Sequence, residues 1–215
     1  MEFLDRSDAG RRLAARLTHL ADDDVVVVGL PRGGVPVASE VARALGAPLD
    51  LIAVRKLGVP VQPELAMGAI GEGGARVLHD EVIRIHGITS EEIEAVEARE
   101  RLELDRVVQR FRGSRDPMPL AGRVVVVIDD GLATGSTARA ACQVAHAKGA
   151  ARVVLAVPVA PRSWPSRLAG AADELVAVTT PDPFAAVGAH YEDFTQTTDQ
   201  EVIDCLRRAG GLSDP

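Results

Sequence analysis

Short apolar runs alternate with amphipathic stretches along most of the chain. The runs are rich in valine and other β-branched residues, a composition typical of strands buried on both faces. They lie at residues 25–30, 49–54, 124–128, 153–159 and 175–178. Apolar residues at helical spacing predict helices at residues 7–20, 163–168 and 199–208, and further helices after the loops that follow residues 30 and 128. Because strands and helices alternate, we expect an α/β fold with a doubly wound, mostly parallel sheet.

The middle of the chain departs from this alternation. Two short apolar segments, residues 65–70 and 76–78, flank a glycine-rich turn and predict a β-hairpin. The glycine- and proline-rich residues 57–64 are typical of a mobile segment. Thr89 and Glu92 have the spacing of a capping box, which opens a long charged helix. We expect this helix to reach about residue 112 and to project as an exposed arm.

Composition places the chain among folded proteins of ordinary size. Its 215 residues, 47% of them hydrophobic, predict a single domain over residues 1–215. We expect a core at about residues 25–180, interrupted by a helical insertion at about residues 80–115. No apolar run approaches the roughly 20 residues of a membrane span, and residues 1–5 lack the pattern of a signal peptide. We therefore expect a cytoplasmic protein with no membrane partner.

The charge balance argues against a nucleic-acid partner. The formal net charge is −7, whereas nonspecific nucleic-acid binding depends on a broad basic surface. Any anionic ligand must therefore be held by local groups. Cys142 and Cys205 lack the spacing of a metal site or a redox pair, so we expect buried or idle thiols.

The strongest chemical signal follows the strand at residues 124–128. This strand ends in Asp129 and Asp130 and continues into a loop of small and hydroxyl residues at the start of a helix. The loop residues are Ala133, Thr134, Gly135, Ser136 and Thr137. Backbone N–H groups at a helix start lack intrahelical partners and can bind a phosphate. The two carboxylates can accept hydrogen bonds from a vicinal diol or hold a hydrated Mg²⁺. The alternative is an ordinary strand-to-helix turn with capping residues.

Two further segments carry basic residues after predicted strands. Pro31, Arg32 and Gly33 follow the first strand, where Gly33 permits close approach of the backbone to an anion and Arg32 supplies a forked donor. Arg55 and Lys56 follow the strand at residues 49–54. Taken alone, the first segment also fits a structural turn and the second a solvated surface pair.

Together these residues resemble the type I phosphoribosyltransferases. The resemblance covers roughly residues 25–194, and its most specific part is the acid pair followed by Thr134 and Gly135. It implies that the acids hold the ribose hydroxyls of 5-phosphoribosyl-1-pyrophosphate (PRPP) and bind Mg²⁺ through water. It also implies that residues 133–137 bind the 5-phosphate, and that Asp129, Asp130 and Arg32 are the catalytic residues.

The same resemblance implies a pyrophosphate site and a base site. The pyrophosphate residues would be Pro31, Arg32, Gly33, Arg55 and Lys56, with a non-proline cis peptide between Pro31 and Arg32. The C-terminal segment at about residues 181–195, here called the hood, is similar to the base-binding hood of purine enzymes. There Phe184 would stack on a nucleobase. Packing of Phe184 in the core is the alternative.

The chain also departs from the patterns of this family. The 6-oxopurine enzymes have an aspartate at the position of Ala133 and often a lysine at that of Ser136, whereas adenine-type enzymes share the Ala-Thr-Gly sequence. We expect Mg²⁺-dependent transfer of a 5-phosphoribosyl group from PRPP to a nitrogen nucleophile, a nucleobase of purine salvage, with release of pyrophosphate. The alternative is a regulatory homologue that binds PRPP or a nucleotide without turnover. The expected partners are PRPP and a small-molecule acceptor of unassigned identity, and the expected assembly is a homodimer.

Overall fold

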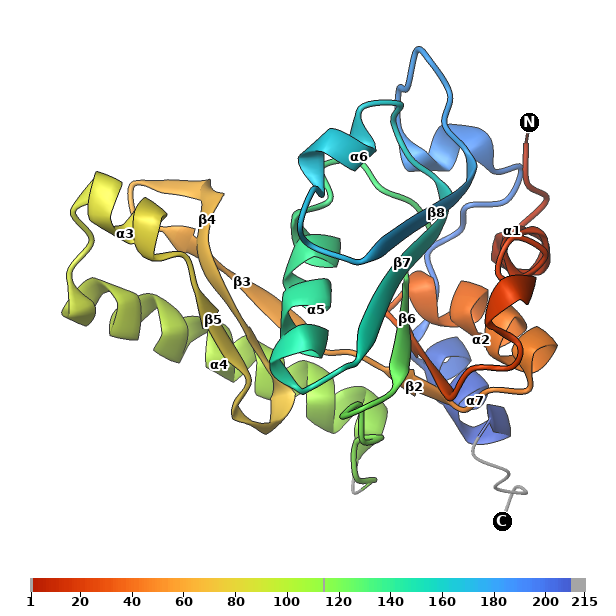
Figure 1. Ribbon diagram of the computed structural model, residues 1–215, viewed down its shortest axis with the longest axis horizontal. Coiled ribbons are helices and arrows are strands. Elements are labelled where there is room, and N and C mark those ends of the chain that lie inside the picture. The colour runs from red at the N-terminus through yellow and green to blue at the C-terminus, as the bar shows by residue number, and fades with distance from the viewer. Residues whose placement is uncertain (1, 114, 210–215) are drawn as a thin grey trace.

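A parallel sheet forms the centre of the molecule. The computed structural model describes residues 2–113 and 115–209. The sheet has five strands in the order β2-β1-β6-β7-β8, all parallel to their neighbours (Figure 1). Their bounds are β1 Val25–Gly29, β2 Leu49–Leu51, β6 Val124–Ile128, β7 Arg152–Val159 and β8 Glu174–Thr179. The carboxyl ends of β1 and β6 lie side by side, since Gly29 pairs with Ile128.

Helices cover both faces of this sheet. The bounds of these helices are α1 Arg6–Ala14, α2 Gly34–Leu45, α5 Ser136–Ala147, α6 Trp164–Arg167 and α7 Asp199–Ala209. Alternate residues of β1 point to opposite faces: Val27 joins the core formed with α1, α2 and α7, and Val26 joins the core formed with α5 and α6. The predicted doubly wound, mostly parallel sheet is confirmed.

A second, antiparallel sheet contains the predicted hairpin. Its strands are β3 Val54–Val59, β4 Gln62–Gly71 and β5 Arg76–Leu78, in the order β3-β4-β5. The predicted strand at residues 49–54 is therefore divided, since its end belongs to the second sheet. Residues 57–64, predicted as a mobile segment, lie mostly within β3 and β4, which pair through most of this stretch. Gly58 instead marks an irregularity in the pairing, where a Cβ would lie 2.4 Å from the Pro63 oxygen.

The predicted arm is a long helix that packs along the second sheet. It is α4 Ser90–Arg112, and the capping box of Thr89 and Glu92 at its start is confirmed. A shorter helix, α3 Asp80–His86, precedes it. The inner face of α4 is buried against the sheet at Ile93, Val96 and Leu104, so only its outer face is exposed. Helix α5 lies between the two sheets (Figure 1). The molecule is thus layered as α4, antiparallel sheet, α5, parallel sheet, and the helices α1, α2 and α7.

The N-terminal segment and the hood meet beside the parallel sheet. The predicted helix at residues 7–20 divides into α1 and a 3-10 turn at Thr18–Leu20, and Asp5 caps the start of α1. Phe3 forms a parallel bridge with Tyr191, in which the Phe3 amide donates to the His190 oxygen at 2.8 Å. The hood, with a 3-10 turn at Val187–His190, is thereby held against the N-terminal segment.

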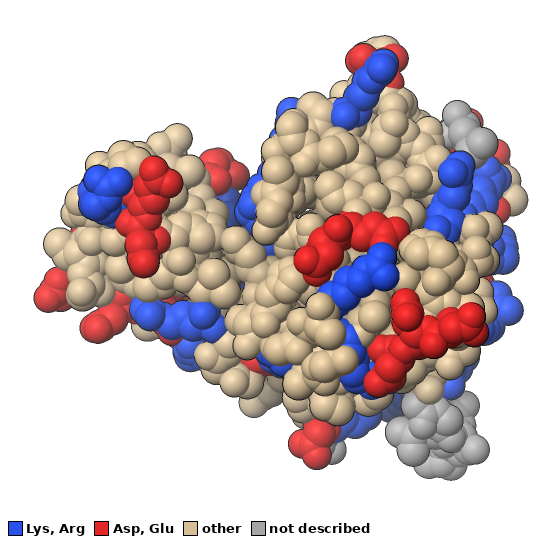
Figure 2. Space-filling view, viewed as in Figure 1, with Lys and Arg blue, Asp and Glu red and all other residues tan. Residues whose placement is uncertain are grey.

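Other expectations from the sequence can be checked directly. Cys142 and Cys205 are buried free thiols, as predicted. Among the described helices, none is both long enough and apolar enough to cross a membrane. Figure 2 shows acidic and basic side chains interspersed on one face of the molecule.

Candidate functional site

Two glycine-containing loops touch at the carboxyl ends of β1 and β6. A Cβ on Gly33 would lie 2.0 Å from Asp130 Oδ2, and a Cβ on Gly34 would lie 2.5 Å from the Ile128 oxygen. Only glycine allows this approach, because any side chain would overlap the acid pair or its strand. The structure therefore brings together the two segments that the sequence predicts as parts of one site, at the edge of the sheet where ligands of such folds bind.

The acid pair is held by residues from both ends of the chain. Arg6 Nε donates to Asp130 Oδ2 at 2.9 Å, and Arg6 Nη2 forms an ion pair with the same oxygen at 2.8 Å. The Tyr191 hydroxyl donates to the Asp130 carbonyl oxygen at 2.6 Å. Asp129 Oδ1 accepts the amide of Asp130 at 2.9 Å. The pair is thus fixed in orientation, with one carboxylate matched to a guanidinium.

The electrostatics of the pair differ between its members. Burial and the negative charge of Asp130 raise the pKa of Asp129 to about 7. Burial also raises the pKa of Asp130, although the charge and hydrogen bonds of Arg6 oppose that rise. Arg6 therefore compensates only part of the negative charge at this strand end.

The residues present fit a hydrated Mg²⁺ at this position. Two adjacent carboxylates are hard oxygen donors, and burial and the charge of Asp130, which raise the pKa of Asp129, both disfavour an ionised form that a cation would stabilise. Within residues 2–113 and 115–209, no group of three or more His, Cys, Asp or Glu side chains forms a metal site. A cation here would therefore depend on water and on ligand oxygens for most of its coordination.

The loop after the acid pair leads directly into helix α5. Gly135 has a φ of +78°, a left-handed conformation that favours glycine, and α5 begins at Ser136. The hydroxyl oxygens of Thr134 and Ser136 lie 2.9 Å apart. Ala133, Thr134 and Thr137 are exposed. The loop thus presents hydroxyls and the amides of a first helical turn to solvent, an arrangement suited to a phosphate.

Two cavities flank this loop. The larger has a volume of about 610 Å³ and is lined by Pro31, Arg32, Arg55 and Thr137, together with residues of α4. The smaller, of about 310 Å³, lies between the loop and the hairpin. Its lining includes Lys56, His79, Thr134, Ser136 and Arg139. Most of the side chains that are predicted to bind phosphate therefore line one of the two cavities beside the loop at residues 133–137.

The predicted basic residues already have acidic neighbours. Arg32 pairs with Asp199 at 3.3 Å, Arg55 with Glu100 at 2.9 Å, and Lys56 with Glu64 at 3.4 Å. Arg55 lines the larger cavity and Lys56 the smaller, although both also border a third hollow near Thr137. The predicted cis peptide between Pro31 and Arg32 is present.

The hood packs over the acid pair. Val187 lies so close to Gly131 that a Cβ there would be 2.4 Å from its Cγ1. Phe184 is half-buried and stacks on His190, with 5.7 Å between ring centroids and an interplanar angle of 23°. Phe184 lines neither of the two cavities beside the phosphate loop. Stacking of its ring on a base stays a prediction.

Several residues of the site were not predicted from the sequence. Arg6 stands just before the first apolar stripe and has no local pattern that indicates its contact with Asp130. The sequence predicts Asp199 only as the start of the last helix. The sequence predicts Arg106 and Arg110 only as parts of a charged helix. The packing of α4 is what brings them to the larger cavity.

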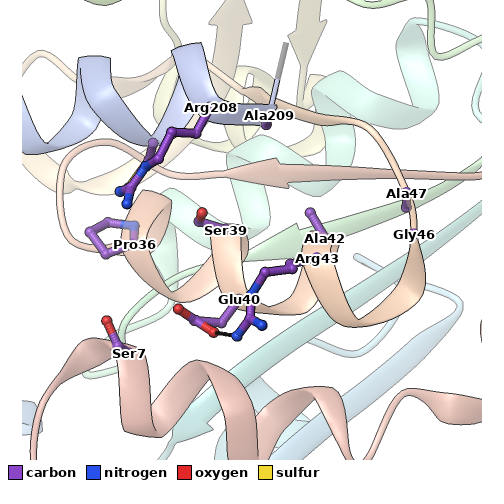
Figure 3. Close-up of a pocket in the computed structure, with 11 residues that line it drawn as sticks. Ser7, Pro36, Ser39, Glu40, Ala42, Arg43, Gly46, Ala47, Arg208 and Ala209 are labelled. Atoms are coloured by element: carbon purple, nitrogen blue, oxygen red, sulfur yellow. Dashed lines mark hydrogen bonds and ion pairs between the residues drawn. The ribbon is translucent and has the colours of Figure 1, made fainter. Parts of the chain in front are cut away.

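A separate cavity lies between α2 and α7. Its volume is about 400 Å³, and its lining residues include Ser39, Arg43 and Arg208 (Figure 3). None of its lining residues belongs to the acid pair or the two loops. We therefore place the candidate site at the strand ends and not in this cavity.

Comparison with known proteins shows the family of this chain. A family model described as the phosphoribosyl transferase domain matches residues 2–192. A curated protein of Mycobacterium tuberculosis, provisionally named a phosphoribosyl transferase, is 58% identical over 207 residues. That match covers 96% of this chain and 47% of the relative, so the chain spans about half the length of the curated relatives it matches.

A solved structure shares nearly the whole fold. The crystal structure of a protein from Thermus thermophilus superposes with a TM-score of 0.91 at 46% identity, covering 97% of this chain and 99% of that one. The family model covers most of this chain, and the acid pair and the loop at residues 133–137 follow one another at the end of β6. This chain belongs to the phosphoribosyl transferase domain family.

Proposed function

We propose that this protein transfers the 5-phosphoribosyl group of PRPP to a nitrogen nucleophile and releases pyrophosphate. The contact between the glycine loop after β1 and the acid pair after β6 carries this proposal. This contact supports the proposal because two loops with backbone amides suited to phosphates lie beside two carboxylates that can accept ribose hydroxyls. In the reaction, the bond from C1 to the pyrophosphate oxygen breaks and a bond from C1 to nitrogen forms, with inversion at C1.

The proposed roles follow the positions of the side chains. Asp129 and Asp130 accept the ribose hydroxyls and bind Mg²⁺ through water. The amides and hydroxyls of residues 133–137 bind the 5-phosphate. The pyrophosphate is bound by Pro31, Arg32, Gly33, Arg55 and Lys56. Positioning and charge neutralisation then account for most of the rate, because charge builds up on the leaving group. Bound Mg²⁺ would supply part of that neutralisation.

We propose a nucleobase as the acceptor. The hood carries Phe184, Tyr191 and Phe194 beside the strand ends, in a chain with only 3% aromatic residues. Flat rings favour a stacked base over an aliphatic amine. Of these, Phe184 is the proposed stacking residue, since Tyr191 is buried and Phe194 packs under the Arg6 guanidinium at 4.1 Å.

A regulatory protein that binds PRPP without turnover is the second candidate. The loop at residues 133–137 has no acid, so no carboxylate stands there to take a proton from the acceptor. Release of pyrophosphate from PRPP in the presence of a panel of nucleobases distinguishes the two candidates. Binding without release favours the regulatory protein.

Ligand-induced stabilisation tests the binding step that both candidates share. At PRPP near 100 times its Kd, with Mg²⁺ present, the gain is about 2.7 kcal/mol, or roughly 5–10 °C in the midpoint of unfolding. Asp130→Asn should reduce this shift, because the ribose loses a charged acceptor. Asp24→Asn, an exposed acid paired with Arg123, is the matched control and should leave the shift unchanged. No shift of the unsubstituted protein at millimolar PRPP and Mg²⁺ would contradict the proposal.

A further inference from the structure

The charged side chains that line the larger cavity at the site are mainly arginines. Four of the five are guanidinium groups, those of Arg32, Arg55, Arg106 and Arg110, and the fifth is the carboxylate of Glu103. The arginines come from the loop after β1, from β3 and from α4. Each has an acidic neighbour, and Arg106 pairs with Glu103 itself. Guanidinium groups still outnumber carboxylates among the lining residues, in a chain whose formal net charge is −7, and this arrangement favours an anionic ligand.

Helix α4 forms the outer wall of this cavity. Arg106, Val107 and Arg110 all line it, and Arg110 follows the other two by four and three positions, which puts the three residues on one side of the helix. Figure 1 shows α4 running from the antiparallel sheet toward α7. This wall of the cavity is therefore formed by α4, the helix that the sequence predicts only as an exposed arm.

One carboxylate already connects the two walls. Asp199 Oδ1 accepts from Arg32 Nη1 at 3.3 Å, and Asp199 Oδ2 lies 3.2 Å from Arg110 Nη1. A single small anion can thus contact both guanidinium groups. These contacts are long, and the side chains of Arg32 and Arg110 are 37% and 61% exposed, so the ion pairs are weak and replaceable. A phosphate offers more charge and more acceptor oxygens than a carboxylate.

The C-terminal end of α4 is fixed rather than free. The buried guanidinium of Arg112 donates to Asp50 at 2.7 Å and to Glu72 at 2.7 Å, which ties the helix end to β2 and to the turn after β4. Arg110 precedes this anchor by two residues and Arg106 by less than two turns. Their backbone positions relative to Arg32 are therefore set by the fold.

We infer that α4 completes the pyrophosphate site, with Arg106 and Arg110 binding the distal phosphate of the PRPP diphosphate opposite Arg32. In the free protein Asp199 occupies this position and is displaced when the diphosphate binds. This inference rests on the proposed function, because it adds residues to the same site. The competing explanation is a surface ion-pair network that only joins α4 to α7.

Calorimetric titration with inorganic pyrophosphate, and separately with ribose 5-phosphate, tests the inference. Arg106→Gln and Arg110→Gln should each weaken pyrophosphate binding by about three- to tenfold. Asp199→Asn should strengthen it by about two- to fivefold, because a competing carboxylate is removed. None of the three should change the Kd of ribose 5-phosphate.

Arg101→Gln is the matched control. It removes the same charge from α4, but Arg101 pairs with Glu97 and does not line the cavity. Pyrophosphate affinities within twofold of the unsubstituted protein for all three site variants would overturn the inference, as would an equal loss in Arg101→Gln or equal losses for both ligands. If the unsubstituted protein binds ribose 5-phosphate but not pyrophosphate, this inference is overturned and the proposed function is not. If it binds neither ligand and does not bind PRPP, the proposed function is overturned as well.

Discussion

At the scale of single residues, the site is built around negative charge that the free protein compensates incompletely. Of the two acids, Arg6 contacts only Asp130, and burial together with the charge of Asp130 raises the pKa of Asp129 to about 7. Such a group costs stability when it ionises in the folded state. In the proposed function, a cation bound with PRPP would offset this cost in stability.

We predict that Asp129→Asn stabilises the ligand-free protein. The pKa of Asp129 is about 7 in the fold against an ordinary value of 3.8, so the folded protein binds the proton more tightly and loses stability as pH rises from about 4 to 7. Removal of the charge should raise the free energy of unfolding on the order of 1–3 kcal/mol at pH 8. The gain should be smaller at pH 5. Urea denaturation at both pH values measures it, and a gain that does not depend on pH would contradict the assignment.

How far the sequence predicts the site depends on whether the contacts are local. Asp129, Asp130 and residues 133–137 lie in one strand-loop-helix unit, so their arrangement follows from sequence order. Gly33 was recognisable because a tight approach needs glycine. Arg6 reaches Asp130 from 124 positions away, and no local pattern encodes such a contact.

At the scale of elements, α4 is positioned by a buried ionic cluster. The side chains of Arg112, Asp50 and Glu72 are only 4%, 8% and 7% exposed, and Arg112 contacts both acids with paired hydrogen bonds. The helix patterns of the sequence predict α4 itself, with its cap. They do not predict this cluster, because its members lie far apart along the chain. The pairing of β3 with β4 is local, but the glycines and prolines of residues 57–64 obscure it in the sequence.

We predict that Arg112→Leu destabilises the protein strongly. The substitution leaves two buried carboxylates without their cation, which costs about 3–5 kcal/mol. Arg99→Leu, at an exposed position of the same helix, should cost less than about 1 kcal/mol. Thermal and urea denaturation of the two variants give the comparison. Similar, small losses in both would show that the cluster does not hold the helix.

At the scale of the whole molecule, the two sheets share α5 as a common layer. A Cβ on Gly71, the last residue of β4, would lie 2.5 Å from Val144 Cγ1 on α5. The antiparallel sheet is therefore in close contact with the helix that also packs on the parallel sheet. Neither sheet can lose its structure without exposing one face of α5.

We predict that both sheets unfold in one transition. Trp164, the single tryptophan, lies on α6 and is buried in the core that α5 and α6 form with the parallel sheet, so its fluorescence reports on that core. Circular dichroism reports on all helices and strands. Gly71→Ala should lower both midpoints together, with a cost of about 1–3 kcal/mol from overpacking. Adding Val144→Ala should relieve part of that overlap. Separate transitions for the two signals would contradict a shared layer.

The bridge between Phe3 and Tyr191 affects when the site can form during synthesis. Asp130 and Tyr191 are 61 positions apart, and Arg6 also donates to the Thr195 carbonyl oxygen. A growing chain therefore contains the acid pair and Arg6 long before the hood that covers them. Until translation has passed residue 195, the nascent chain has the loops after β1 and β6 but lacks the hood contacts that hold the acid pair and Arg6.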